Sequence, residues 1–310
     1  MTAVPNRYRG RMSELGKYEV RRFRDLSPFL PRVSPELHWY FLANRKKFDV
    51  VINNGYQIPL SLEIGIHPHP NLIFRSHFHG IVGHTAAMSV LHRFYKPFGR
   101  IMVNHSRVIV CGSEYEAKAF AEAFPEAAKK IRVIREGVQP IECHAGTRRV
   151  HRVLTISRLE RYKGVQHVIR SLRYLPEYRL DIVGEGPFKK ELIHLAKEAG
   201  VTDRITFHGF VEEAARNRLF CLASVFVLLS EQEAYGIVVG QSLTAGVPCV
   251  VLNKNALSEW IDNRSCYGVN DQTDYQGLAE KIRTAEQVKP SARVPTWGDY
   301  MREFSRLVSR

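Results

Sequence analysis

Short apolar, β-branched runs alternate with helix-like segments through the second half of this chain. The runs are 151–157, 179–184, 205–208, 225–229 and 247–252, and helical stretches separate them. Runs of about four to eight apolar residues between helices are typical of a parallel sheet covered on both faces. This pattern predicts a doubly wound, Rossmann-like α/β domain, with ligands at the carboxyl ends of its strands.

The first half repeats the alternation. Strands are predicted at 48–52, 72–74, 108–111 and 131–134, and helices at 34–45, 83–104 and 113–124. A length of 310 residues is enough for two domains. A polar stretch at 140–148 separates the two series, and an amphipathic helix is predicted at 296–308. We therefore expect one domain over 1–147, a second over 148–292, and a C-terminal helix in 293–310 that packs back toward the first.

The chain is strongly basic, with 45 Lys and Arg against 31 Asp and Glu and a formal net charge of +14. Such a charge favours anionic partners: nucleic acid, an anionic membrane surface or phosphorylated substrates. Because basic residues spread over both halves and no zinc-finger, KH or RRM signature occurs, nucleic acid is not an expected partner. A basic N-terminal cluster predicts either membrane contact or a solvated tail: Arg7, Arg9, Arg11, Lys17, Arg21, Arg22 and Arg24.

No segment is predicted to span a membrane or to direct secretion. The longest apolar run, 219–229, is shorter than the about 20 residues that a spanning helix needs, and the polar N-terminus lacks the apolar core of a signal peptide. The five cysteines form no C-x-x-C, so neither a zinc site nor a disulfide framework is predicted. Cys221 and Cys249 lie in apolar runs and are interpreted as buried small hydrophobes. These features favour the cytoplasm, with peripheral contact at the inner membrane face left open.

Two loops of the second half follow predicted strands and open predicted helices. The first, 157–164, carries Arg158, Arg161 and Lys163 beside a helix N-terminus, where anions are favoured. Arginine can hold two phosphate oxygens at once, and lysine supplies a compact charge. The loop is therefore predicted to bind phosphate, with a solvated basic turn as the alternative.

The second loop, 229–241, contains an acidic residue and a glycine before its helix. Glu233 can accept hydrogen bonds from sugar hydroxyls, and Gly236 lets backbone N–H groups approach a ligand closely. The alternative is that Ser230 and Glu233 form a capping box for the next helix. A third glycine-bearing turn at a strand end, Gly184 to Pro187, carries little weight by itself.

Together, SRLERYKG, VGEGP, HGF and SEQEAYGIVVGQSLTAGVPCVV resemble, in order and spacing, the retaining glycosyltransferases of family 4, which have the GT-B fold. The resemblance covers the second half and implies two Rossmann-like domains. It implies that Arg158 and Lys163 hold the diphosphate of a nucleotide-sugar donor and that Glu233 contacts its sugar. Gly184 belongs to the same group of candidates.

The same resemblance implies further donor contacts. Backbone amides around Tyr235, Gly236 and Ile237 would bind phosphate. Gly209 and Phe210 lie where the family places backbone that contacts the base.

The first half also resembles this family. The run 75–85 (RSHFHGIVGHT) is similar to a pattern of archaeal-type members and implies a histidine near the reacting sugar carbon. His77 is the preferred candidate, with His79 as the alternative and Gly80 beside them. His77, His79 and His84 could instead form a metal site, but no acidic or cysteine ligand sits beside them and the family needs no metal. No metal ion is therefore expected.

The sequence departs from the family at two places. Gln241 stands where the second glutamate of the family's E-x7-E pattern holds the ribose, so we expect weaker or altered nucleotide binding. The usual N-terminal glycine-rich strand–loop–helix has no counterpart, and the first strand-like segment is 18–23. A shortened first domain is therefore expected, which could remove part of the acceptor site.

The resemblance implies a glycosyltransferase that moves a hexose-type sugar from a UDP- or GDP-linked donor to an acceptor hydroxyl, with retention of configuration. The acceptor would be a glycan, a lipid-linked molecule or a small molecule, and no cofactor would be needed. The alternative is a degenerate, non-catalytic GT-B subunit that binds a nucleotide sugar or a partner glycosyltransferase. Gln241 and the missing N-terminal unit favour this alternative, whereas the set of Arg158, Lys163 and Glu233 argues against it.

Overall fold

The computed structural model describes residues 2–4, 13–15, 18–24, 33–56, 59–78, 80, 86–144, 146 and 149–309, with side chains described from residue 20 onward except 59 and 86–94. The chain divides into two compact units. One consists of Met1–Ile134 with Glu303–Arg310, and the other is Arg135–Arg302. Among the described residues, no helix is both long and apolar enough to cross a membrane.

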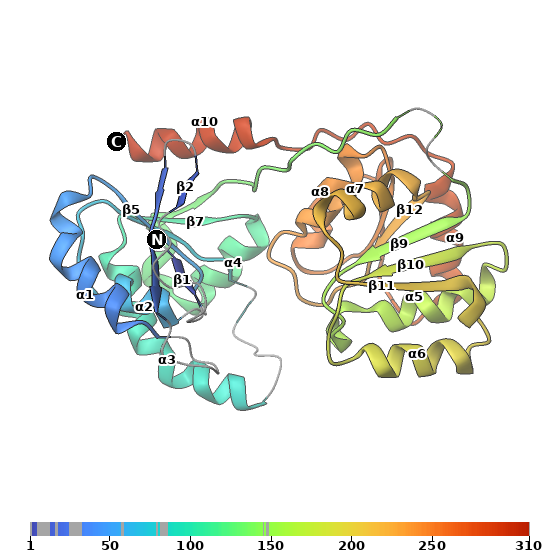
Figure 1. Cartoon of the computed structure of the whole chain (residues 1–310), viewed down its shortest axis with the longest axis horizontal. Helices are drawn as coiled ribbons and strands as arrows, with labels where there is room; N and C mark the ends of the chain where they lie inside the picture. Colours follow the sequence, from blue (N-terminus) through green and yellow to red (C-terminus); the bar gives the residue numbers. More distant parts are fainter. Residues whose placement is uncertain are drawn as a thin grey trace. The chain divides into compact units, whose positions relative to one another are not determined.

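The first unit is built on a four-stranded parallel sheet in the order β5-β6-β7-β8. Its strands are β5 (Val51–Asn54), β6 (Leu72–Arg75), β7 (Val108–Cys111) and β8 (Ile131–Val133), and its helices are α1 (Pro35–Asn44), α2 (Pro59–Gly65), α3 (Ala86–His105) and α4 (Glu114–Ala123) (Figure 1). Two small pairs precede them: β1 (Thr2–Val4) runs parallel to β4 (Arg22–Arg24), and β2 (Ser13–Leu15) antiparallel to β3 (Tyr18–Val20).

Buried aromatic rings fill the core of this unit. Tyr56, Phe74, Phe78, Phe120 and Phe124 are each fully buried. Tyr56 and Phe78 meet edge to face at 5.4 Å, and Phe78 meets Phe120 in the same way, also at 5.4 Å. Edge-to-face contact is a favoured arrangement of aromatic pairs. The core therefore fixes the chain just beyond the carboxyl ends of β5 and β6, where Tyr56 and Phe78 lie.

The second unit is built on a six-stranded parallel sheet in the order β11-β10-β9-β12-β13-β14. Its strands are β9 (Arg152–Ile156), β10 (Arg179–Val183), β11 (Ile205–Gly209), β12 (Val225–Leu228), β13 (Cys249–Leu252) and β14 (Cys266–Val269), and its helices are α5 (Val165–Ser171), α6 (Lys189–Glu198), α7 (Glu213–Leu222), α8 (Ile237–Thr244) and α9 (Tyr275–Glu286). Figure 1 shows these strands and helices in green to orange. The strand order is that of a doubly wound Rossmann fold, so the predicted fold class is confirmed.

The division between the units lies earlier than the predicted boundary at 147/148. The segment after residue 134 is already bound to the second unit. The Val138 N–H donates to the carbonyl oxygen of Pro295 at 2.8 Å, and the Ile141 N–H donates to Thr244 Oγ1 at 3.3 Å. The C-terminal helix α10 (Trp297–Val308) crosses the second division at 302/303.

Cys221 is buried, as interpreted from the sequence, but the expectation of no disulfide framework is wrong. Cys221, on α7, forms a disulfide with Cys143. The two cysteines are 78 residues apart, so no local spacing in the sequence predicts the bond. Cys249 is free and buried, as predicted. The disulfide attaches the segment that leads into β9 to α7.

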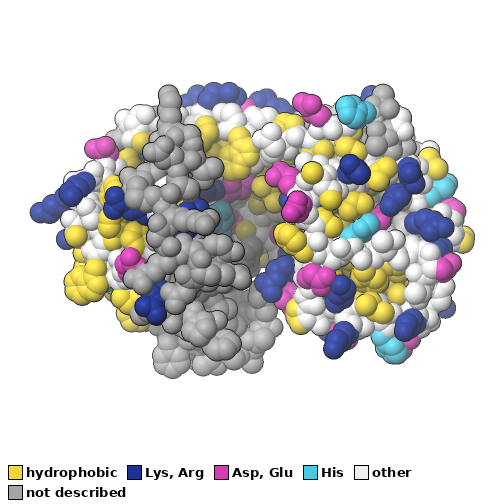
Figure 2. Space-filling model, viewed as in Figure 1, with side chains coloured by type: hydrophobic (Ala, Val, Ile, Leu, Met, Phe, Trp, Pro, Cys, Tyr) yellow, Lys and Arg dark blue, Asp and Glu magenta, His cyan; other side chains and the backbone are white. Residues whose placement is uncertain are grey.

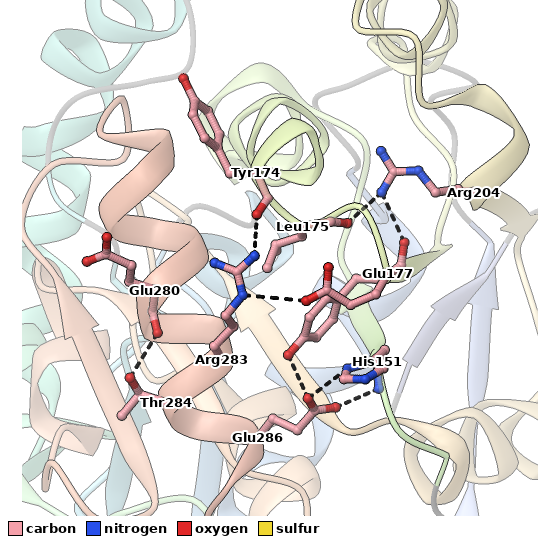
Figure 3. A network of polar contacts seen from close by, with 10 residues as sticks. His151, Tyr174, Leu175, Glu177, Arg204, Glu280, Arg283, Thr284 and Glu286 are labelled. Atoms are coloured by element: carbon pink, nitrogen blue, oxygen red, sulfur yellow. Dashed lines mark hydrogen bonds and ion pairs between the residues drawn. The ribbon is translucent and has the colours of Figure 1, made fainter.

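The amino ends of β9 and β10 are held by a buried carboxylate on α9 (Figure 3). Glu286 Oε2 accepts a hydrogen bond from the Tyr178 hydroxyl at 2.6 Å and contacts His151 Nδ1 at 3.0 Å, and Oε1 accepts from the His151 N–H at 2.6 Å. Burial by itself would raise the pKa of Glu286. Hydrogen bonds from Ser224, Tyr178 and the His151 amide outweigh burial, so this pKa lies below its ordinary value. The carboxylate is therefore a stabilising group when ionised.

We expect Glu286→Gln to lower the free energy of unfolding by about 1–3 kcal/mol at pH 7, because buried donors lose a charged acceptor. The folded-state pKa is depressed, so the stabilisation is complete above the unfolded-state pKa and disappears as pH falls through the folded one. Urea unfolding at a series of pH values, followed by tryptophan fluorescence, measures both effects. Glu280→Gln, on the exposed side of α9, is the matched control. Equal stability of the two variants at pH 7 would contradict the prediction.

Candidate functional site

The candidate site lies at the carboxyl ends of β9 and β12. The chain runs outward from β9 to β10 and β11, then returns to β12 on the other side of β9. Strand order therefore reverses between β9 and β12, and doubly wound folds bind ligands at this switch point. The 157–164 loop follows β9. The loop after β12, residues 229–236, is called the donor loop below.

The two loops meet through one ion pair. Lys163 Nζ lies 2.5 Å from Glu233 Oε1, with the two side chains only 14% and 15% exposed. The Glu231 N–H also donates to the carbonyl oxygen of Tyr162 at 2.8 Å. The structure thus brings together the predicted phosphate-binding cation and the predicted sugar-binding carboxylate. A cation and a hydrogen-bond acceptor side by side can face the diphosphate and the sugar of one ligand.

The other two cations of the 157–164 loop contact residues other than Glu233. The Arg158 side chain is 73% exposed and pairs with Glu160 at 2.9 Å. The guanidinium of Arg161 lies 5.0 Å from the ring centre of Phe188. Ser157, at the end of β9, has a buried hydroxyl oxygen with no hydrogen-bond partner among the described residues. The sequence argument missed Ser157, although it is the polar residue that directly follows β9.

Glycines allow the strand-end turns to pack backbone against backbone. Gly184 has a φ of +128°, and a Cβ built on it would lie 1.9 Å from the Ser157 carbonyl oxygen. Its N–H donates to the carbonyl oxygen of Gly209 at 2.8 Å. The predicted Gly184 and Gly209 turns therefore adjoin each other, and the Gly184 turn adjoins the 157–164 loop. Phe210, the predicted base-contacting position, is 84% exposed.

A segment that the sequence argument missed holds the donor loop in place. Asn255 Nδ2 donates to the Ser230 carbonyl oxygen at 3.0 Å, and Trp260 Nε1 donates to the Tyr235 carbonyl oxygen at 2.7 Å. Asn255 is buried and has a φ of +53°, a conformation that asparagine adopts more readily than most residues. The preference of asparagine for a left-handed backbone is the sequence feature that could have indicated this support.

The capping-box alternative for the donor loop is wrong. Ser230 Oγ donates to the Gln232 carbonyl oxygen, and α8 begins only at Ile237. Gly236, with a φ of +83°, precedes the helix and gives it no side-chain cap. The first amides of α8 therefore lack a capping side chain, as an anion site requires. Gln241 lies half-buried one turn further along the same helix.

The first-unit candidates lie at the carboxyl end of β6. His77 has a φ of +46° and an exposed side chain. The buried carboxylate of Glu116, on α4, accepts hydrogen bonds from the Ser76 hydroxyl, the Phe78 N–H and the Gly112 N–H at 2.5–2.7 Å. Glu116 therefore holds both neighbours of His77, Ser76 through its hydroxyl and Phe78 through its backbone N–H. The sequence argument missed this role, although the S-x-x-E spacing of Ser113 and Glu116 was a helix-start signal.

The structure says less about the other residues predicted around His77. His79 and His84 lie outside the described residues, and Gly80 has a φ of +103°. The described part of the chain contains no group of three or more His, Cys, Asp or Glu side chains arranged to hold a metal ion.

Two family models match the chain, one on each half. Residues 148–296 match the model described as "Glycosyl transferases group 1", and residues 5–142 match "Glycosyltransferase Family 4". Among curated relatives, uncharacterized glycosyltransferase MJ1607 of Methanocaldococcus jannaschii is 33% identical over 112 residues, 35% of this chain and 29% of that protein. N-acetyl-alpha-D-glucosaminyl L-malate synthase of Bacillus anthracis is 26% identical over 132 residues, 42% and 34% of the two chains. The chain thus spans about a third of these relatives' lengths.

Solved structures match over nearly the whole chain. Anabaena HepE, crystallised with UDP and glucose, superposes with a TM-score of 0.74 at 17% identity, covering 93% of this chain and 85% of that one. Sucrose-phosphate synthase from Thermosynechococcus elongatus gives a TM-score of 0.70 at 16% identity, covering 93% and 82%. These likenesses show a shared GT-B fold.

We expect Gly184→Ala to destabilise the second unit by about 3 kcal/mol or more, because the new methyl group adds a backbone collision to an unfavourable φ. Gly200→Ala is the matched control. Gly200 has a φ of +67° with no atom within 4 Å of a built Cβ, so this variant loses only about 1–2 kcal/mol. Thermal unfolding of both variants measures the difference, and equal losses would contradict the close approach at Ser157.

Proposed function

We propose that this chain transfers a hexose-type sugar from a nucleotide diphosphate to an acceptor hydroxyl with retention of configuration. The chain is a GT-B glycosyltransferase by its fold and by the family models that match both halves. The observation that supports this proposal most directly is the Lys163–Glu233 pair at the switch point of the second sheet. The UDP and glucose held by Anabaena HepE support a nucleotide-sugar donor.

Lys163 and the first amides of α8 would stabilise the departing diphosphate. As the bond between the sugar carbon and the diphosphate oxygen breaks, its electron pair goes to the diphosphate and negative charge grows there. A fixed cation and a helix N-terminus stabilise that charge without needing to reorganise. Glu233 would orient the sugar by accepting hydrogen bonds from its hydroxyls. The acceptor hydroxyl would bond to the sugar carbon on the face that the diphosphate leaves and pass its proton to the departing diphosphate oxygen, so that the configuration is retained.

The other predicted donor contacts complete the proposal. Arg158 would add charge at the diphosphate, and Gln241 would hold the ribose through neutral hydrogen bonds. Gly209 and Phe210 would contact the base of a UDP- or GDP-linked donor. We propose that His77 lies near the reacting carbon and that transfer needs neither a metal ion nor another cofactor.

The acceptor would be a glycan, a lipid-linked molecule or a small molecule. Trp39 on α1 is 68% exposed and is followed by exposed Lys46 and Lys47, which supports contact with an anionic membrane beside a lipid-linked acceptor. Among the described residues on the face shown in Figure 2, Lys and Arg are scattered without forming one dominant patch, which supports excluding nucleic acid as a partner. The enzyme names of the relatives support catalysis over the alternative of a non-catalytic subunit.

We expect one of UDP, GDP and ADP to raise the thermal stability of the chain. A ligand at 100 times its dissociation constant adds about 2.7 kcal/mol to the free energy of unfolding. The double variant Arg158→Ala/Lys163→Ala should lose this effect, because it removes both predicted phosphate cations. Thermal unfolding with each nucleotide identifies the base. Absence of stabilisation by all three, or an unchanged effect in the double variant, would contradict the donor site.

We expect Lys163→Ala to lower sugar transfer at least about 100-fold, the scale of losing one fixed charge donor in the transition state. Arg161→Ala is the control, because it removes a cation from the same loop whose guanidinium faces Phe188. Its transfer rate should stay within about threefold of the unmodified chain. Release of the nucleotide diphosphate, measured with the donor identified above, gives both rates. Transfer by the Lys163 variant at a near-normal rate would refute the proposed role.

A further inference from the structure

The side chain of Tyr235, in the donor loop, reaches the segment by which the chain enters the second unit. Its hydroxyl donates to the carbonyl oxygen of Glu136 at 3.0 Å. Its ring packs on Trp260 with the ring centres 5.1 Å apart, and its own carbonyl oxygen accepts the Trp260 indole N–H. Burial raises the pKa of the phenol above its ordinary value, so the hydroxyl remains a donor at neutral pH. Tyr235 therefore joins three parts of the second unit.

The segment that Tyr235 reaches, Arg135–Val138, is called the connector below. It is where the chain enters the second unit, directly after the division at 134/135. Val138 bridges to Thr296, on the segment by which the chain leaves that unit. A Cβ on Gly137 would lie 2.6 Å from the Trp297 Cα, and a Cβ on Gly240 would lie 2.7 Å from Val138 Cγ2. The connector is thus packed closely against both α8 and the outgoing chain.

A second contact links the connector to the segment that supports the donor loop. The Arg135 guanidinium lies 3.8 Å from the Glu259 carboxylate. Glu259 precedes Trp260, whose indole holds the Tyr235 carbonyl. The ion pair is largely exposed on its arginine side, so it contributes little by itself. The Tyr235 hydroxyl forms a direct hydrogen bond between the donor loop and the connector.

We infer that Tyr235 is a positioning residue: its phenol couples the donor loop to the connector, so that the placement of Glu233 and of the first α8 amides depends on where the connector lies. Tyr235 lies two residues after Glu233 and two before the first residue of α8. A displacement of the connector is transmitted through the Tyr235 hydrogen bond to the donor loop that carries Glu233, and through the same loop to the start of α8. The coupling acts equally in the other direction, because linkage between two sites is reciprocal. The consequence for transfer rests on the proposed function, but the coupling itself does not.

Hydrogen exchange of the ligand-free chain tests the coupling directly. Tyr235→Phe removes only the hydroxyl and should speed amide exchange about fivefold in both the donor loop and the connector. Tyr178→Phe is the matched control, because it removes one hydroxyl bonded to Glu286 at the opposite end of the same sheet. Its exchange should change only around α9 and the starts of β9 and β10. Faster exchange in Tyr235→Phe confined to the donor loop, or no change, overturns the inference.

A second arm uses UDP and UDP-glucose. UDP should slow exchange in the donor loop and the connector of the unmodified chain, but only in the donor loop of Tyr235→Phe. With UDP-glucose as donor, Tyr235→Phe should lower kcat about tenfold and change the donor KM less than about twofold. Protection that still reaches the connector in the variant, or a raised KM with unchanged kcat, overturns the inference. If UDP protects no part of the unmodified chain, the UDP-donor proposal fails, and the ligand-free arm still decides the coupling.

Discussion

Backbone packs directly against backbone at the carboxyl edge of the second sheet, and the candidate site depends on this contact. A Cβ on Gly164 would lie 2.3 Å from the Leu229 carbonyl oxygen, and one on Gly184 would lie 1.9 Å from that of Ser157. Only glycine permits both the approach and the left-handed φ at these positions. Because the loops touch at this range, a short ion pair can form between Lys163 and Glu233 although 70 residues separate them. The site thus follows from the strand order together with glycine, which has no side chain, at positions 164 and 184.

The sequence predicted the sheets well because strands buried on both faces are continuous apolar runs. β12 and β13 are fully buried and were predicted, whereas β14, of the same length, was missed because a glycine interrupts its apolar run, Cys266-Tyr267-Gly268-Val269. The Cys143–Cys221 bond and the supports from Asn255 and Trp260 were missed for another reason. Each joins residues that local patterns do not relate, and only the folded chain brings them together.

The contacts of charged side chains were also beyond what local sequence patterns predict. The 157–164 loop presents three cations that the sequence treats alike, yet Arg158 pairs with Glu160, Arg161 lies over Phe188, and only Lys163 reaches Glu233. Spacing indicated which loop lies at the switch point, while the contacts of each side chain depend on the residues that the fold places beside it. A net charge of +14 therefore indicates anionic partners in general, whereas a half-buried ion pair at the switch point indicates one place for an anion.

Backbone strain marks the candidate residues in both units. His77 and Asn255 each hold a left-handed φ without being glycine, a conformation that costs about 1–2 kcal/mol. Such a residue persists only where its surroundings over-determine it. Glu116 does this for His77 by accepting hydrogen bonds from the Ser76 hydroxyl and the Phe78 N–H, one on each side of it, and the hydrogen bonds of the Asn255 amide do so beneath the donor loop. His151 has the same backbone conformation away from the site, where Glu286 binds both its amide and its ring. Strain alone thus does not identify a functional residue. His77 differs in that its imidazole is exposed at the carboxyl end of a strand, whereas the His151 ring contacts the Glu286 carboxylate at the amino end of another.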